Sequence, residues 1–246
     1  MSSKELFTIL DVVESTNNYA MGQVHAGLAV HGQTWFAREQ WGGRGQRANK
    51  WLSSKDENLI MTVVLKPDKV FYNNIFLFNM VIASVCHQFF TSIGGGSTTL
   101  KWPNDIYSDD RKAGGVLIEN IFMSNQWKWA VVGIGININQ KIFAEESRKA
   151  TSLKLITALT NDPVKLAQKL HLMILECMNE INQEKVDFYF EYYNQYLFKK
   201  NELVRLKKDN IIFTTKIKEV NKYGQLITTD VIERQFEHGE IKWMLD

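Results

Sequence analysis

The topology of the chain is set by residues 99–139, which read TLKWPNDIYSDDRKAGGVLIENIFMSNQWKWAVVGIGININ. Three strand-length apolar segments lie in this stretch, at 99–107, 113–122 and 127–137. The turn formers of 108–110 and 124–125 separate them. This arrangement predicts an antiparallel meander.

Shorter strands and longer helices are expected on both sides of this meander. Strands are expected at 5–12, 33–37 and 58–65. Side chains that can cap a helix occur at 14–17, and that helix is expected to run to about residue 26. Apolar residues at helical spacing predict a core helix over 74–92, and Asp162-Pro163 begins another long helix.

After residue 198 the pattern changes to short, closely spaced strands, at 203–206, 211–217, 225–229 and 241–245. We therefore predict two domains, 1–199 and 200–246. The fold class is α+β: a mixed, mainly antiparallel sheet with helices on one side, followed by a small SH3-like β-barrel.

Composition excludes several classes of protein. With 246 residues, 45% hydrophobic and 23% charged, the chain is not typical of disordered, collagen-like or disulfide-stabilised proteins. Its net charge of +2 does not indicate nucleic acid as a partner. Cys86 and Cys177 lack metal or redox spacing and are interpreted as reduced core residues. The charged N-terminus and the short apolar runs predict a cytoplasmic protein with no membrane partner.

A glycine-rich basic loop covers residues 38–50. It carries four basic residues against one acidic residue, Glu39, and its glycines expose backbone N–H groups. Such a loop is suited to bind an anion, although a solvated basic loop is the alternative. It is not a Walker A loop, because it lacks Gly-Lys-Ser/Thr and no helix follows it.

Three further segments place polar groups or glycines inside predicted strands. Pro103 removes a ladder donor, so Asn104 and Asp105 are expected to be presented at a bulge or edge, or else to form an ordinary turn. Lys112 precedes Gly114-Gly115, and 133–139 repeats the paired glycines. Two glycine pairs on one sheet predict a floor without side chains, which a ligand could approach closely.

In this order and spacing, these motifs resemble the biotin protein ligase family, over roughly residues 8–140. The matching motifs are Lys-Trp-Pro-Asn-Asp, then Arg-Lys-x-x-Gly-x-Leu-x-Glu, then Gly-x-Gly-x-Asn. The resemblance implies the class II synthetase-like biotin/lipoyl ligase fold. It also implies an enzyme that forms biotinyl-5'-AMP from biotin and ATP with Mg²⁺ and transfers biotin to a lysine of a biotin carboxyl carrier protein domain.

The resemblance also implies roles for individual residues. The predicted catalytic residues are Lys112, Arg44, Arg47 and Asp105, with Asp105 orienting the incoming lysine or receiving its proton. Biotin binding is expected at Ser15, Thr16, Asn17, Gln40, Gly43, Arg44, Gly45, Lys112, Gly114 and Gly115. ATP binding is expected at Arg44, Gln46, Arg47, Trp51, Lys101, Asn104 and Asn137. No protein metal ligand is predicted, and Glu119 is interpreted as a charge at the end of a strand.

Two positions depart from the family pattern, because Gln46 replaces a frequently basic residue and Ala48 replaces a glycine. We expect no N-terminal winged helix and carry over no DNA binding. A lipoate or octanoate ligase shares the fold but resembles a different Arg-Arg-x-x-Gly-Gly-Gly pattern. A non-catalytic ligand-binding module is the other alternative, disfavoured by the retained Lys112 and Asp105. The oligomeric state is left open between monomer and homodimer.

Overall fold

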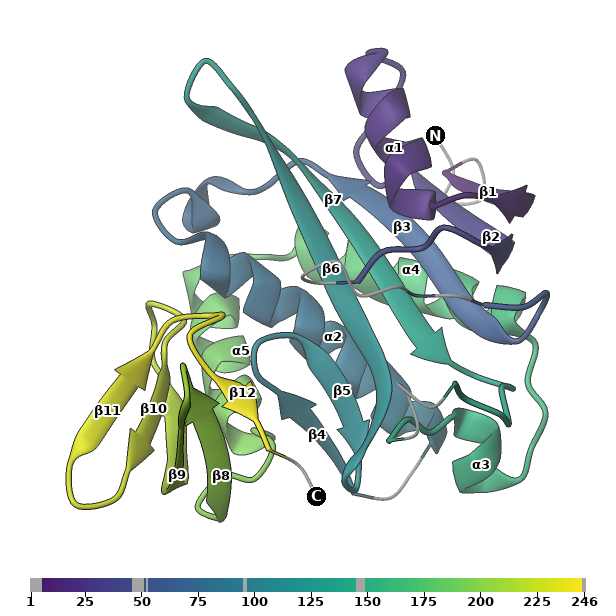
Figure 1. Cartoon of the computed structure of the whole chain (residues 1–246). Coiled ribbons are helices and arrows are strands. Elements are labelled where there is room, and N and C mark those ends of the chain that lie inside the picture. Colours follow the sequence, from purple (N-terminus) through teal and green to yellow (C-terminus); the bar gives the residue numbers. More distant parts are fainter. Residues whose placement is uncertain (1–5, 46–50, 52, 95–96, 145–148, 245–246) are drawn as a thin grey trace.

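The computed structural model of the chain describes residues 6–45, 51, 53–94, 97–144 and 149–244. These residues form two β-sheets and five α-helices (Figure 1). The first sheet comprises β1 Phe7–Val13, β2 Thr34–Gln40, β3 Asn58–Leu65, β4 Thr98–Lys101, β5 Asp105–Ser108, β6 Arg111–Met123 and β7 Gln126–Asn137. The second comprises β8 Leu203–Lys208, β9 Ile211–Val220, β10 Leu226–Thr229, β11 Glu233–Phe236 and β12 Lys242–Trp243. The helices are α1 Thr16–His25, α2 Ile75–Gly94, α3 Leu153–Thr157, α4 Pro163–Asn179 and α5 Gln183–Gln195.

The larger sheet is mixed and mainly antiparallel, as predicted. Its order is β1-β2-β3-β7-β6-β5-β4, and its parallel pair is β1 with β2 at one edge. Strands β5, β6 and β7 form the expected meander. Strand β3 is buried along its whole length, as its run of apolar residues predicted. Strands β3, β7 and β6 therefore form the centre of the fold.

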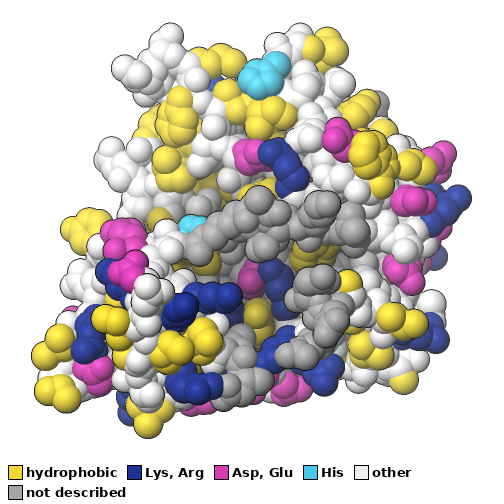
Figure 2. All heavy atoms as spheres, viewed as in Figure 1, with side chains coloured by type: hydrophobic (Ala, Val, Ile, Leu, Met, Phe, Trp, Pro, Cys, Tyr) yellow, Lys and Arg dark blue, Asp and Glu magenta, His cyan; other side chains and the backbone are white. Residues whose placement is uncertain are grey.

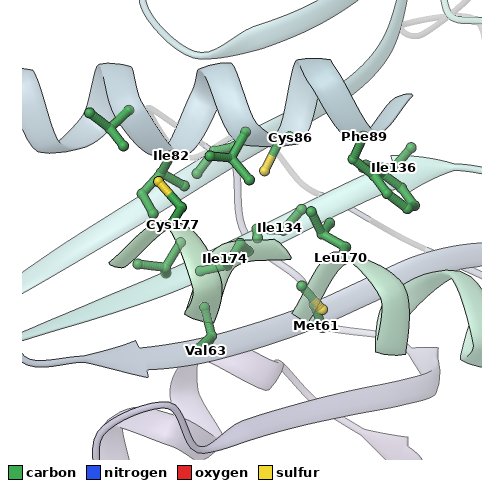
Figure 3. Packing of buried hydrophobic residues seen from close by; sticks show 14 of the residues in the cluster. Met61, Val63, Ile82, Cys86, Phe89, Ile134, Ile136, Leu170, Ile174 and Cys177 are labelled. Atoms are coloured by element: carbon green, nitrogen blue, oxygen red, sulfur yellow. The ribbon is translucent and has the colours of Figure 1, made fainter. Parts of the chain in front are cut away.

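The main core lies between this sheet and helices α2 and α4. Apolar side chains of β3 and β7, such as Met61 and Ile134, meet Phe89 of α2 and Leu170 of α4 (Figure 3). The predicted caps are present: the side chain of Ser15 accepts from Asn18 N, and that of Asp162 accepts from Val164 N. Helix α4 begins with proline at its first position, where a missing N–H costs nothing.

Helix α1 differs from the prediction of helices on one side. It packs Ala20 and Val24 against Trp35, Val64 and Val131, in a small separate cluster. Val64 and Val131 alternate along their strands with the residues of the main core, so they point to the opposite face of the sheet. The large helices cover one face, and α1 covers part of the other.

The segment 99–107, predicted as one strand, is a hairpin of β4 and β5. The chain turns at Trp102-Pro103-Asn104, and the Trp102–Pro103 peptide bond is cis. The indole Nε1 of Trp102 donates to the carbonyl of Gly224, at 2.9 Å, in the C-terminal part of the chain. The turn, one of the two alternatives predicted for this motif, is therefore the observed structure.

The C-terminal strands form a sheet in the order β11-β10-β9-β8-β12, in agreement with the expected SH3-like region. Its core also contains residues before 200, among them Met80, Trp102 and Tyr193. This cluster contains side chains from both sides of the expected boundary, so the two parts share a hydrophobic core. The division into domains 1–199 and 200–246 stays a prediction. Helices α3 and α5 and strand β11 were not predicted from the sequence.

Helix α2 is long and apolar enough to cross a membrane by length and composition, but 61% of its most apolar window is buried inside the fold. Cys86 on this helix and Cys177 on α4 are both free and buried, as expected. Burial strongly raises the pKa of the Cys86 thiol. Helix α2 is thus accounted for as the core helix of the larger sheet.

Replacement of Leu170 by Ala should lower the free energy of unfolding by about 2–5 kcal/mol, because it leaves a cavity between α4 and the sheet. Leu172, on the same helix but 50% exposed, is the matched control, and Leu172→Ala should cost about 0.5 kcal/mol or less. Urea denaturation followed by circular dichroism measures both. Equal losses would contradict the assignment of the core.

Candidate functional site

A buried polar cluster forms where the N-terminus of α1 meets β3. Thr16 and Asn17 are both nearly inaccessible to solvent. The hydroxyl of Thr62 on β3 lies 2.9 Å from Thr16 Oγ1 and 2.7 Å from Asn17 Oδ1. Ser15 caps the helix and presents its neighbours at the end of the strand–helix turn. Uncharged donors and acceptors therefore line this end of the site.

Gln40 joins this cluster to the loop that follows β2. Its Oε1 accepts from Thr16 N at 2.8 Å, and its Nε2 donates to the carbonyl of Trp51 at 3.3 Å. The N–H of Trp51 donates to Gly43 O at 2.8 Å. A Cβ at Gly43 would overlap Gln40 and the Trp51 backbone, so this close approach requires glycine. The two ends of the loop are thus fixed to each other and to α1.

The glycines of β6 and β7 form the floor of the site. An added Cβ at Gly133 would overlap the Asn17 side chain, one at Gly135 would lie 2.5 Å from the Trp51 ring, and one at Gly115 would lie 2.8 Å from Asp105 Oδ1. At Gly114 it would instead meet Ile136, on the core face. The predicted floor therefore consists of Gly115, Gly133 and Gly135, whereas Gly114 faces the other way.

Lys112 and Asp105 form an ion pair beside Gly115. Lys112 Nζ lies 2.6 Å from Asp105 Oδ1, and the two side chains are 35% and 23% exposed. The ammonium is also 5.8 Å from the centre of the Trp51 ring, within the range of a cation–π contact. The backbone of Lys112 is held by Thr151 N, which donates to its carbonyl at 2.8 Å. A cation is therefore placed over the floor on a firmly held strand.

Lys101 lies at the next position along this edge, opposite Asp105 in the β4–β5 pair. Its ammonium is 5.3 Å from the ring centres of both Tyr107 and Trp243. Burial between these rings lowers the pKa of Lys101 to about 8, and the nearby charge of Lys112 adds to this effect while Asp105 opposes it. Lys and Arg side chains also gather on the lower part of this face in Figure 2.

Arg44 and Glu119 close the opposite side of the site. Arg44 Nη2 lies 3.0 and 3.1 Å from the two carboxylate oxygens of Glu119, and Glu119 Oε2 accepts from Asn17 Nδ2 at 2.9 Å. The sequence did not predict that Glu119 and Thr62 belong to the site. Glu119 shares a strand face with Gly115, and Thr62 is a polar residue between apolar ones inside β3, so strand alternation could have indicated both.

Two predicted site residues, Asn104 and Asn137, form hydrogen bonds inside the fold. Asn104 was expected to be presented, but it is buried and its Nδ2 donates to the carbonyl of Val116. Asn137 is also buried, and its Nδ2 donates to Thr151 O at 2.9 Å, next to the backbone of Lys112. Both therefore stabilise the strands that carry the site. Gln46 and Arg47 lie outside the described residues.

The geometry thus brings most of the predicted residues onto one face of the sheet. Its uncharged end consists of Thr16, Asn17, Gln40 and Thr62, and its cations are Arg44, Lys101 and Lys112. The described part of the chain contains no group of three His, Cys, Asp or Glu side chains that could hold a metal ion. The arrangement suits a ligand with a neutral polar head and an anionic end.

Curated proteins are similar to this chain in sequence. The chain is 30% identical over 182 residues to the bifunctional ligase/repressor BirA of Salmonella typhimurium, covering 74% of this chain and 56% of that protein. It is 30% identical over 127 residues to the biotin–[acetyl-CoA-carboxylase] ligase of Paracoccus denitrificans, covering 51% of each. The chain spans about half the length of these curated relatives.

A solved structure extends the likeness over nearly the whole chain. The biotin protein ligase of Aquifex aeolicus in complex with biotin and ATP superposes with a TM-score of 0.80, at 25% identity, over 98% of this chain and 99% of that one. The model of the biotin/lipoate A/B protein ligase family matches residues 9–137, which include the polar cluster, the floor and the Lys112–Asp105 pair. The chain therefore belongs to the biotin/lipoate A/B protein ligase family.

Proposed function

We propose that the protein is a biotin protein ligase, which forms biotinyl-5'-AMP from biotin and ATP and transfers biotin to a lysine of a biotin carboxyl carrier protein domain. One observation carries the proposal: the neutral polar cluster around Asn17 and the Lys112–Asp105 pair lie at the glycine floor formed by neighbouring strands. A ureido head and a carboxylate at opposite ends of an apolar tail match that arrangement.

In the first step, a carboxylate oxygen of biotin bonds to the α-phosphorus of ATP, and the bond from that phosphorus to the bridging oxygen breaks to release pyrophosphate. Two anions approach each other, so cations must offset their charge. We assign this role to Lys112 and Arg44, together with Arg47. Asp105 holds the Lys112 ammonium at 2.6 Å and so positions it above Gly115.

The remaining residues bind the two substrates. We assign the biotin head group to Ser15, Thr16, Asn17 and Gln40, with the backbone of Gly43, Gly45 and Gly115 along its tail. Short neutral side chains suit a ureido ring, which both donates and accepts hydrogen bonds. We assign the nucleotide to Lys101, Trp51 and Gln46, and its phosphates also to Arg44 and Arg47. Asn104 and Asn137 support the strands at that end.

In the second step, the amine of the carrier lysine attacks the acyl carbon of biotinyl-5'-AMP. The new C–N bond forms, the bond from that carbon to the phosphate oxygen breaks, and AMP leaves while the nitrogen loses a proton. Asp105, 23% exposed at the edge of the floor, orients the incoming lysine amine or receives this proton. A carrier domain is the protein partner that this step requires.

Mg²⁺ is proposed to enter with the phosphates of ATP. The phosphate oxygens of ATP would hold it, because the described residues form no group of three His, Cys, Asp or Glu side chains. We also propose a cytoplasmic location, which the two free, buried cysteines support.

Incubation with ATP, labelled biotin and a carrier domain tests the proposal. Labelled carrier is the expected result. Binding of biotin without transfer would support a non-catalytic module instead, and labelling by lipoate but not biotin would support a lipoate ligase.

Lys112→Ala should reduce formation of the adenylate by about two to three powers of ten, the scale seen on removing one group that stabilises a transition state. Pyrophosphate exchange dependent on biotin measures it. Lys128→Ala, at the exposed tip of the β6–β7 hairpin, is the control and should leave the rate unchanged. Wild-type exchange in the Lys112 variant would remove this residue from the mechanism.

Gly133→Ala should raise the Kd for biotin about tenfold or more, because the added methyl overlaps Asn17 and displaces it from the pocket. Gly22→Ala is the matched control: nothing lies within 4 Å of its added Cβ in α1. Since alanine favours a helix, this control should stabilise the fold by up to about 1 kcal/mol and leave biotin binding unchanged. Isothermal titration calorimetry compares the two, and normal biotin binding by the Gly133 variant would refute the pocket.

The affinity for ATP should depend on pH through Lys101. The charged ammonium predominates below its pKa of about 8 and is lost above it, so anion binding should weaken as pH rises. From about pH 7 to pH 9 the charged fraction falls about tenfold, which sets the expected loss of affinity. Lys101→Arg keeps its charge and should bind ATP equally at both values. Parallel pH profiles for wild type and variant would assign the dependence to another group.

A further inference from the structure

Glu119 carries a carboxylate on the site face of the sheet. It lies in β6 on the same face as Gly115, and Val131 of β7 is its partner in the ladder. Its side chain is 28% exposed. A charge that is largely removed from water requires partners to offset the lost hydration. Glu119 has two such partners in the site, Asn17 and Arg44.

The first partner, Asn17, has its amide orientation fixed by this contact. Asn17 Nδ2 donates to Glu119 Oε2 at 2.9 Å, and its Oδ1 faces the Thr62 hydroxyl at 2.7 Å. If the amide were turned over, its oxygen would face a carboxylate, and two acceptors would oppose each other. The acceptor oxygen of Glu119, together with the more distant carbonyl of Leu117 at 3.4 Å, therefore determines which atoms of Asn17 face the pocket.

The second partner, Arg44, has its charge offset by the same carboxylate. Nη2 makes both contacts to Glu119, and a guanidinium carries three further N–H donors on its other two nitrogens. Arg44 is 49% exposed, so it lies where a ligand can reach it. An anion that binds Arg44 meets the field of Glu119 and has to displace it or share the guanidinium with it.

We propose that Glu119 is a positioning residue for both substrates: it fixes the Asn17 amide in the biotin pocket and opposes anion binding at Arg44. The inference rests on the proposed function, since it takes biotin and ATP as the ligands. Its consequence is that the two effects are separable. The orientation of Asn17 requires an acceptor oxygen, whereas the opposition at Arg44 requires a negative charge.

Glu119→Gln separates them, because glutamine keeps the length and an acceptor oxygen but removes the charge. Biotin binding measured by calorimetry should stay within about twofold of wild type. The Kd for ATP should fall about two- to fivefold, the range for a partly exposed ion pair. This gain should vanish in about 1 M salt, where such interactions are screened.

Glu119→Ala removes the acceptor as well as the charge. Its affinity for biotin should fall about tenfold, the usual scale for a lost hydrogen bond to a charged group, while ATP binding improves as in the glutamine variant. Glu119→Asp provides the independent check if the alanine variant is insoluble. It keeps the charge but shortens the side chain by one methylene, so biotin binding should weaken with no gain for ATP.

Glu233→Gln is the control, because it removes a comparable surface ion pair with Lys218, at 2.6 Å, in the C-terminal sheet. It should change neither Kd. Weaker ATP binding in Glu119→Gln, or equal changes for both ligands in all Glu119 variants, would overturn the inference and indicate a merely structural role. Failure of the proposed function is distinguishable, since wild type itself would then make no biotinyl-AMP.

Discussion

The pairing of β7 on both of its edges is the constraint on which the site depends. This strand is bonded to β3 from Asn58↔Asn137 to Leu65↔Ala130 and to β6 over most of its length. Glycine normally weakens a strand, because it adds conformational entropy to the unfolded chain and no side chain to pack. Here the two ladders and the core beneath Ile134 and Ile136 hold the backbone in place. Gly133 and Gly135 can therefore leave the other face bare.

The same sheet separates two environments that require opposite kinds of residue. One face is covered by α2 and α4 (Figure 1). That face is almost entirely apolar, while the other carries hydroxyl, amide and charged groups. Polar groups buried on that second face are tolerated because they satisfy one another, as Thr62, Asn17 and Gln40 do. Replacement of one member leaves another buried group without a partner, so these residues act as a set.

Much of the fold could be predicted from the sequence because its signals are local. The apolar run of 58–65, the helical spacing of 74–92 and the Asp162-Pro163 cap each correspond to an observed element. At Pro103 the sequence left a turn and a bulged strand as alternatives, because apolar residues on both sides of the turn resemble one continuous strand. The position of α1 on the opposite face was missed, since periodicity shows that a helix has an apolar side but not which sheet face receives it.

For the site, the motifs predicted which residue types matter but not how they are connected. Strand alternation separates Gly115 from Gly114, yet that distinction requires the register of β6 against β7. Asn104 was expected to be exposed, but its side chain instead donates a hydrogen bond to a backbone carbonyl of β6. Glu119 was read as a charge at the end of a strand because its partners lie 75 and 102 residues away in the sequence. Long-range pairing of this kind leaves no short pattern.

The hydrogen bond from Trp102 to Gly224 limits how the C-terminal strands can be exchanged between relatives. It links the turn between β4 and β5, next to Asp105, to a loop of the C-terminal sheet, where Gly224 has a φ of +87° and no room for a Cβ beside Phe76. The C-terminal strands are therefore not an interchangeable appendage. A chimera that takes them from a relative has to import a glycine turn of the same shape, or the indole N–H loses its acceptor and the turn that holds Asp105 loses its support.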